Sequence, residues 1–150
     1  MPSTLVATRL RITELLLESV ADSAKLREAL CAMSELIGAD AGLLAWGRRS
    51  NAGVRGVMSS ERDMPDGKFD GTSFPCFDLY RRCALSQPEG RLARDTEVLG
   101  YAHACGMADD ADAIALQAVD GLERRMAHLD TIDDRVCYVG FARRASEEPF

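Results

Sequence analysis

The chain has 150 residues, 47% of them hydrophobic and 28% charged, and a formal net charge of −6. This length suits one domain with its own core, the composition argues against extended disorder, and the acidic balance argues against direct nucleic-acid binding. No stretch approaches the length of a membrane span and the N-terminus lacks the pattern of a signal peptide, so we expect a cytoplasmic protein without membrane contact.

Two N-terminal helices are predicted over residues 3–38. Apolar residues recur at helical spacing from residue 4 to 19. In "KLREALCAMSELIGAD" they form a single stripe, with Asp22 or Ser23 available as the N-cap and Gly38 placed where a helix ends with positive φ.

The first of these helices has two apolar stripes, one of Leu5, Ile12 and Leu16 and a second of Val6, Leu10 and Leu17. A helix packed on one side only would normally have one stripe. We therefore predict a homodimer through this helix. The alternative is that the second helix covers the extra stripe within one monomer.

The middle of the chain alternates strands, loops and short helices. "AGLLAWGR" (41–48) and "VRGVMSS" (54–60) predict a hairpin around "RSNAG", and the Gly-, Pro- and Asp-rich stretch 60–75 predicts a loop. Short helices are predicted over 76–85 and 96–105.

"GYAHACGM" (100–107) is the only place where His and Cys come so close together. On a helix, His103 and Cys105 lie about 200° apart and cannot bind one metal ion. We interpret the segment as a helix end, capped by Asp95 at its start and by Gly106 at its end, with Val98, Tyr101, Ala102 and Cys105 buried.

Three strands are predicted at the end of the chain, over 113–119, 122–132 and 135–143, joined by Asp120-Gly121 and Asp133-Asp134 turns. The whole predicts an α+β fold. An antiparallel sheet of about five strands has the N-terminal helices on one face and the short helices and loop on the other.

His128 and Cys137 fall on one sheet face if both turns have two residues, together with Met126, Val139 and Phe141. That face could line a small-molecule cavity, or His128 could be a core histidine bonded to backbone. The predicted ligand-binding residues are Trp46, Phe77, Tyr80, His128 and Cys137, with Trp46 open to a core role as well. No catalytic or metal-binding motif is present, and no cofactor can be named.

A family resemblance rests on "LREALCAMSELIGADAGLLAW", on "PEGRL" leading to "GYAHACGMADDADAIALQAV", and on the terminal "VCYVGFARRASEEPF". The pattern resembles the PAS/GAF-like sensory domains that precede the helix-turn-helix of bacterial LuxR-type transcription regulators. The resemblance implies a single sensory domain over 1–150, with a helical pair (3–38), a sheet with inserted short helices (39–143) and a linker (144–150) to an output domain outside this chain.

Such a domain would bind a small molecule or a partner and control transcription through its output. Two alternatives remain open. One is a small enzyme that uses Cys and His on the same fold, and the other is a protein-interaction or dimerisation module without a ligand.

Overall fold

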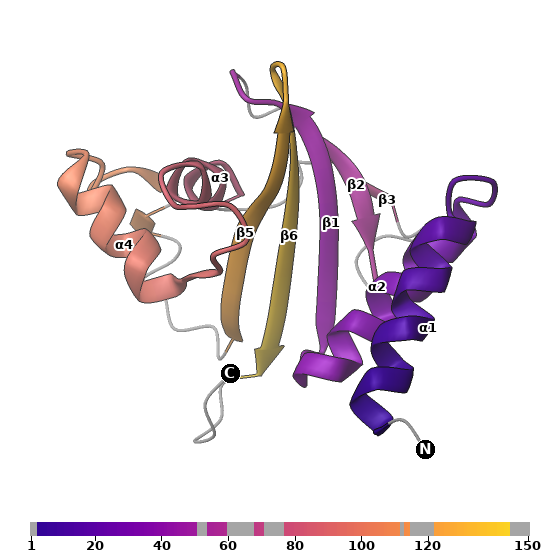
Figure 1. The fold of residues 1–150 in the computed structure, drawn as a ribbon. Helices are drawn as coiled ribbons and strands as arrows, with labels where there is room; N and C mark the ends of the chain where they lie inside the picture. The colour runs from indigo at the N-terminus through magenta and orange to yellow at the C-terminus, as the bar shows by residue number, and fades with distance from the viewer. Residues whose placement is uncertain are drawn as a thin grey trace.

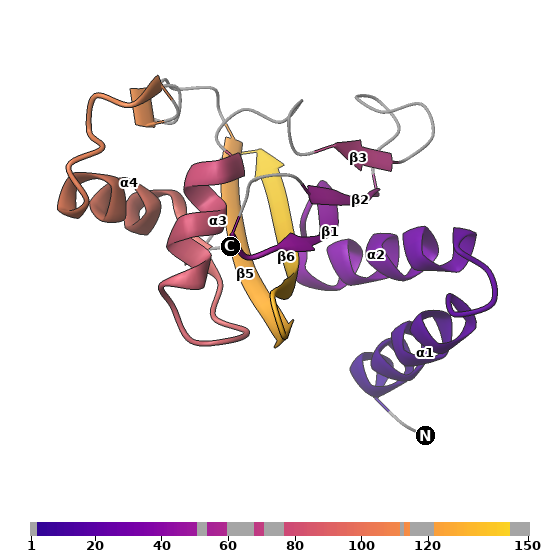
Figure 2. The ribbon, with the colours of Figure 1, turned by 90° about the horizontal axis from the view of Figure 1, so that it is seen from above.

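An antiparallel sheet of six strands, in the order β3-β2-β1-β6-β5-β4, stands between two pairs of helices (Figures 1 and 2). The structure is a computed structural model that describes residues 3–50, 54–59, 68–70, 77–111, 113–114 and 122–144. Helices α1 and α2 lie on one side of the sheet and α3 and α4 on the other. The predicted α+β class and the placement of the helices on opposite faces are confirmed.

Both N-terminal helices form where the sequence predicts them. Helix α1 spans Thr4–Glu18, and the Ser3 hydroxyl accepts a hydrogen bond from the Val6 N–H at 3.3 Å. Helix α2 spans Ala24–Ile37, with the Asp22 carboxylate accepting from the Ala24 N–H at 3.0 Å. Gly38 ends α2 with a φ of 73°, as predicted.

Strands β1 (Ala41–Arg48) and β2 (Val54–Met58) form the predicted hairpin, since they pair antiparallel. Strand β3 (Lys68–Asp70) lies inside the segment predicted to be loop and pairs with the outer edge of β2. The other described strand that the sequence did not predict is β4 (Ala93–Arg94), which pairs with β5. These two edge strands make the sheet six-stranded.

Helices α3 (Phe77–Leu85) and α4 (Asp95–Ala104) agree with the two predicted short helices. The predicted helix end after His103 is confirmed, because the Met107 N–H bonds to the Ala102 carbonyl at 2.7 Å and Gly106 has a φ of 70°. Two details were wrong. Asp95 is the first residue of the helix rather than its cap, and Cys105 is exposed.

Strands β5 (Leu122–Ile132) and β6 (Arg135–Arg144) form the predicted hairpin around Asp133-Asp134, with Asp133 at a φ of 54°. The strand predicted over 113–119 is wrong at its start, since Ala113 and Ile114 are helical. Its remainder and the Asp120-Gly121 turn lie outside the described residues. The described neighbour of β5 on its other side is β4.

Apolar side chains pack against both faces of the sheet. The larger cluster lies between the sheet and helices α3 and α4, on what we call the α3 face, which includes Leu43, Ala45, Met126, Val136 and Tyr138. The smaller cluster lies under α2, on what we call the α2 face, which includes Leu44, Ala127, Val139 and Phe141.

Helix α1 packs on α2, which separates it from the sheet (Figure 2). Leu15 is its one buried residue, and Ile12 is half-buried. Val6, Leu10 and Leu17 of the second predicted stripe are 44%, 58% and 70% exposed. The alternative in which α2 covers this stripe is therefore wrong.

Candidate functional site

The five predicted site residues divide between the two faces of the sheet. Phe77, Tyr80 and His128 lie on the α3 face, and Trp46 and Cys137 are directly paired neighbours on the α2 face. The prediction that His128 and Cys137 share a face is wrong.

A β-bulge separates His128 from Cys137. His128 pairs with Tyr138 and Asp130 with Cys137, so that Leu129 is an extra residue in β5 without a direct partner. Because side chains alternate along a strand, one extra residue moves His128 to the face of Tyr138. The Cys–His pair needed for the enzyme alternative is not assembled at this position.

His128 serves the core. It is 6% exposed, and its Nδ1 lies 2.7 Å from the carbonyl oxygen of Ala84, near the end of α3. This is the backbone-bonded core histidine considered as the alternative to a cavity residue. The backbone carbonyl of His128 also accepts from the Gly90 N–H at 2.8 Å, so β5 holds both ends of the α3–β4 connection.

Phe77 and Trp46 have different surroundings. Phe77 is 1% exposed and packs edge-on against Tyr138, with ring centroids 6.0 Å apart. Trp46 is 44% exposed, so it is not part of the core. Of the five predicted residues, Tyr80 alone reaches the hollow described next.

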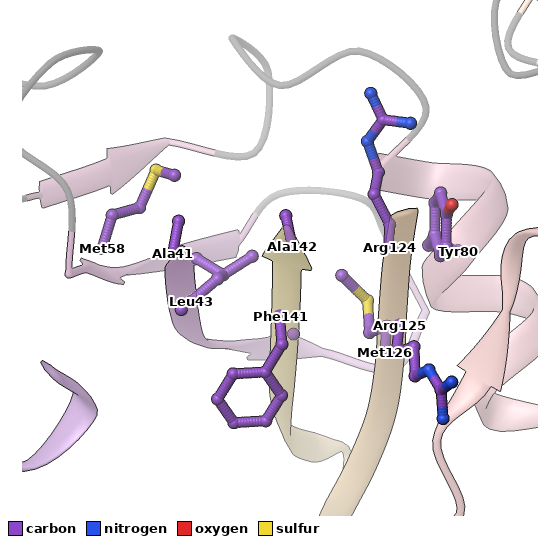
Figure 3. Close-up of a pocket in the computed structure, with 11 residues that line it drawn as sticks. Ala41, Leu43, Met58, Tyr80, Arg124, Arg125, Met126, Phe141 and Ala142 are labelled. Carbon is purple, nitrogen blue, oxygen red and sulfur yellow. The ribbon is translucent and has the colours of Figure 1, made fainter. Parts of the chain in front are cut away.

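A hollow opens on the α3 face where β1 and β5 begin and β6 ends (Figure 3). Its walls enclose about 390 Å³, part of which is open to solvent. The backbone of β6 forms the floor at Gly140, where the lack of a side chain leaves room. The lining residues are Ala41, Gly42, Leu43, Met58, Tyr80, Arg124, Arg125, Met126, Gly140, Phe141 and Ala142.

The side chains that face the hollow are mainly apolar. Leu43, Met58 and Met126 line it in Figure 3, and the Phe141 ring points to the other side of the sheet. The two methionines have flexible, polarizable side chains that can adapt to a ligand. Arg124 is on the same face as Ala142, with which it pairs, and brings a positive charge to the rim.

Asp95 holds Tyr80 and the backbone of Arg124, two residues that line the hollow, in place. Its carboxylate accepts a hydrogen bond from the Tyr80 hydroxyl and lies 3.4 Å from the backbone N–H of Arg124. One side chain thus links α3, the start of α4 and β5. The Tyr80 ring, 1% exposed, is held as a rigid wall.

Strand β1 separates the hollow from α2. An added Cβ at Gly42 would overlap the Ser34 Oγ and come within 3.0 Å of the Leu30 Cδ1 of α2. The Gly42 N–H donates to the Ser59 hydroxyl at 2.6 Å, and the Ser59 carbonyl accepts from the Cys31 thiol at 3.7 Å. Gly42 and Ser59 therefore contact α2 directly, and they are the chain neighbours of Leu43 and Met58, which line the hollow.

Sequence analysis missed most of this site. A signal was present in β6, where the small residues Gly140 and Ala142 alternate with Val139 and Phe141. Small residues on one face of a strand leave space that a large neighbour would fill. The face itself could not be assigned without the register of β5 and β6.

No metal site is found in the part of the chain that the structure describes, where no three His, Cys, Asp or Glu side chains come together in a suitable group. No helix of the described residues is long and apolar enough to cross a membrane. Comparison of the chain with protein-family models, with curated proteins and with solved structures finds no match.

Proposed function

We propose that the chain is a cytoplasmic sensory domain of the PAS/GAF-like kind, which binds a small apolar ligand in the hollow on the α3 face. The observation that carries the proposal is the hollow itself, whose lining is apolar and whose floor is open at Gly140. A sheet with N-terminal helices on one face and short helices on the other is also the arrangement that the resemblance implies.

The lining restricts the ligand. The 390 Å³ of the hollow includes open solvent, so the space enclosed by protein is much smaller than this figure. The ligand is therefore small, with an apolar body against Leu43, Met58 and Met126. An acceptor or acidic group on the ligand would find the positive charge of Arg124 at the rim.

The ligand would act through β1. A group that enters between Leu43 and Met58 pushes on a strand whose other side is in contact with Ser34 and Leu30 of α2. Closely packed contacts transmit such displacements because they have no free space to absorb them. Since α1 packs on α2, the displacement reaches the outermost helix and any output attached or associated there.

We further propose that α1 forms the contact between two copies of the chain. Five apolar side chains of α1 are at least 40% exposed, namely Leu5, Val6, Leu10, Leu16 and Leu17. Large exposed apolar patches on one element are typical of protein interfaces. An isologous contact of α1 helices would place two ligand-responsive helices side by side.

Methionine NMR tests the ligand proposal. In protein labelled with ¹³C at the methionine methyl groups, Met58 and Met126 line the hollow, while Met33 and Met107 lie elsewhere and act as internal controls. Titration with indole or hexanoate should shift the Met58 and Met126 signals and leave those of Met33 and Met107 unchanged. Equal shifts at these four of the six methionines, or none, would overturn the proposal and favour the ligand-free interaction module.

A variant in which a side chain fills the hollow provides the matched control for ligand binding. A Cβ at Gly140 would lie 3.4 Å from the Met126 Cε, so Gly140→Val occupies the hollow without a severe overlap at the first added atom. This variant should stay folded and lose the indole-induced shifts. The enzyme alternative predicts turnover rather than saturable binding, and its Cys–His pair would have to come from residues other than His128 and Cys137.

A further inference from the structure

Trp46, the sole tryptophan, lies on the α2 face and is 44% exposed. Its directly paired neighbours are Arg55 on β2 and Cys137 on β6. Arg48 is two residues further along β1 on the same face and pairs directly with Arg135. We call Trp46, Arg48, Arg55 and Arg135 the Trp46 surface.

All three arginines of this surface are exposed. Side chains directly opposite each other on neighbouring strands have Cβ atoms about 5 Å apart, and like charges in such positions are destabilising. The Arg48–Arg135 pair is therefore unfavourable for the isolated fold. Two like charges held together beside an exposed indole are suited to an anionic partner.

Arg48 and Arg135 have no ion pair with any side chain that the structure describes, whereas Arg55 is directly paired with Asp70 of β3. The carboxylate of the neighbouring hairpin turn, Asp134, accepts a hydrogen bond from the Ser50 hydroxyl at 3.2 Å instead. Elsewhere in the described part of the chain, arginines such as Arg82 and Arg143 form ion pairs with an acidic neighbour. The guanidinium groups of Arg48 and Arg135 thus lie near Trp46 without an ion pair to a described side chain, in a chain whose net charge is −6.

We propose that the Trp46 surface binds an acidic segment of a partner protein. Carboxylates bind guanidinium groups through paired, charge-assisted hydrogen bonds, and the indole supplies the flat apolar contact between them. Trp and Arg are the side chains that most often carry binding energy at protein interfaces. The surface lies on the face opposite the hollow, so the proposal does not depend on ligand binding.

A nucleic acid is the less suitable occupant. Three arginines neutralise few phosphates, and the acidic balance of the chain repels the remainder of a polyanion. A short acidic peptide needs only the few contacts that the Trp46 surface offers.

Intrinsic fluorescence tests the proposal, because all tryptophan emission comes from Trp46. The probe is a short peptide of alternating Glu and Leu, and the control peptide has Gln in place of Glu. We expect a saturable change in emission with the Glu peptide alone, lost in about 1 M salt, where the screening length is about 3 Å. No change, or an equal change with the Gln peptide, would overturn the proposal.

Paired charge variants locate the site. Arg48→Gln with Arg135→Gln should weaken binding at least about tenfold, as expected when two charged contacts are removed. Arg9→Gln with Arg11→Gln on α1 changes the net charge equally and should leave the affinity unchanged. If both double variants weaken binding alike, the attraction is a general charge effect and the proposal fails.

Two other results would show that a different molecule binds the Trp46 surface. Saturable binding of oligothymidylate that exceeds that of the Glu peptide would assign the surface to nucleic acid and overturn the proposal. A change in Trp46 emission on dilution of the protein alone would assign it to a contact between copies. Because Arg48→Gln relieves a repulsion, it should also raise the midpoint of thermal unfolding slightly, which shows that loss of binding is not loss of folding.

Discussion

Gly42 lies directly beneath the Ser34 side chain of α2, with no space between them for a Cβ atom. The Ser34 hydroxyl donates to the Leu30 carbonyl at 2.9 Å, so it is not free to turn away. Among the described glycines, Gly42 is the one at which an added Cβ atom would meet atoms of α2. It joins the strand beside the hollow to the helices that would transmit a signal.

Gly42→Ala should therefore destabilise the fold by about 1–3 kcal/mol, the usual cost of overpacking a core, and move α2 away from β1. Denaturant unfolding measures the change. Gly100→Ala is the control, because Gly100 lies in α4 with no atom within 4 Å of an added Cβ. That variant should be more stable by about 0.5–1 kcal/mol. Equal effects of the two changes would contradict the tight contact.

Tyr138→Phe should stabilise the protein by up to about 1 kcal/mol. The Tyr138 hydroxyl is buried and has no hydrogen-bond partner of normal geometry in the described part of the chain, because the nearby Arg81 guanidinium bonds to Asp78 and to the Arg49 carbonyl instead. Removal of the hydroxyl therefore removes a desolvation cost. Thermal unfolding at neutral pH should show a midpoint raised by about 2–4 °C for a chain of this size. A lower midpoint would mean that the hydroxyl has a bonding role.

The same tyrosine adds a dependence on alkaline pH. Burial raises the pKa of Tyr138 above its ordinary value of about 10, and the nearby charge of Arg81 offsets part of the rise. Below about pH 10 the tyrosine is protonated in both the folded and the unfolded chain, so the free energy of unfolding does not depend on its ionisation. As the pH rises towards the folded-state pKa, the free energy of unfolding falls, because the unfolded chain ionises first. Tyr138→Phe should lose less stability than the wild type between about pH 9 and 11.

His128→Leu should cost about 1–3 kcal/mol, because it leaves the buried Ala84 carbonyl without the imidazole bonded to it at 2.7 Å. The chain has only two histidines, and the exposed His103 provides the control. His103→Ala should change stability by less than about 0.5 kcal/mol at a pH where imidazole is neutral. Urea unfolding of both variants makes the comparison.

Thiol labelling should follow burial. Cys105 is exposed and should react first with iodoacetamide, whereas Cys83 is 0% exposed. Burial, with the charge of Glu97, raises the pKa of Cys83, so that little thiolate forms at about pH 8. Mass mapping of labelled peptides should show Cys83 modified only in denaturant. Cys137 should react no faster than a free thiol at about pH 6, since His128 lies on the other face.

The proposed dimer has a mass test. Sedimentation equilibrium at micromolar concentration should give twice the monomer mass of 16.3 kDa. Leu10→Glu with Leu17→Glu places two charges on the exposed side of α1 and should give the monomer without loss of helix content. A single species at the monomer mass for the wild type would overturn the interface.

Much of the fold could be predicted because its signals are local. Residue spacing and Gly38 determine α2, and the Asp133-Asp134 turn determines the last hairpin within the chain itself. The edge strands β3 and β4 could not be predicted, because they have only three and two residues and no hydrophobic pattern of their own. Their structure depends on the strands beside them.

The site was harder to predict, and Leu129 is the reason. Nothing in "AHLDTI" shows that one residue will bulge, yet the bulge decides which residues accompany His128. Trp46 shows a second limit. An isolated aromatic residue on a strand predicts burial, and its exposure follows from how far α2 extends along the sheet.

The brevity of β3 and β4 has a consequence for behaviour in concentrated solution. In the described residues these two strands form both margins of the sheet, and each presents only two or three residues to an incoming strand. Beyond β4, the edge of β5 is bonded by the Asp95 carboxylate at the Arg124 N–H and by the Gly90 N–H at the His128 carbonyl. Short edge strands, here with the charged Arg94 on β4, oppose the strand-by-strand growth that leads to amyloid. Self-association of this protein should therefore remain helical and reversible on dilution, without fibres that bind thioflavin.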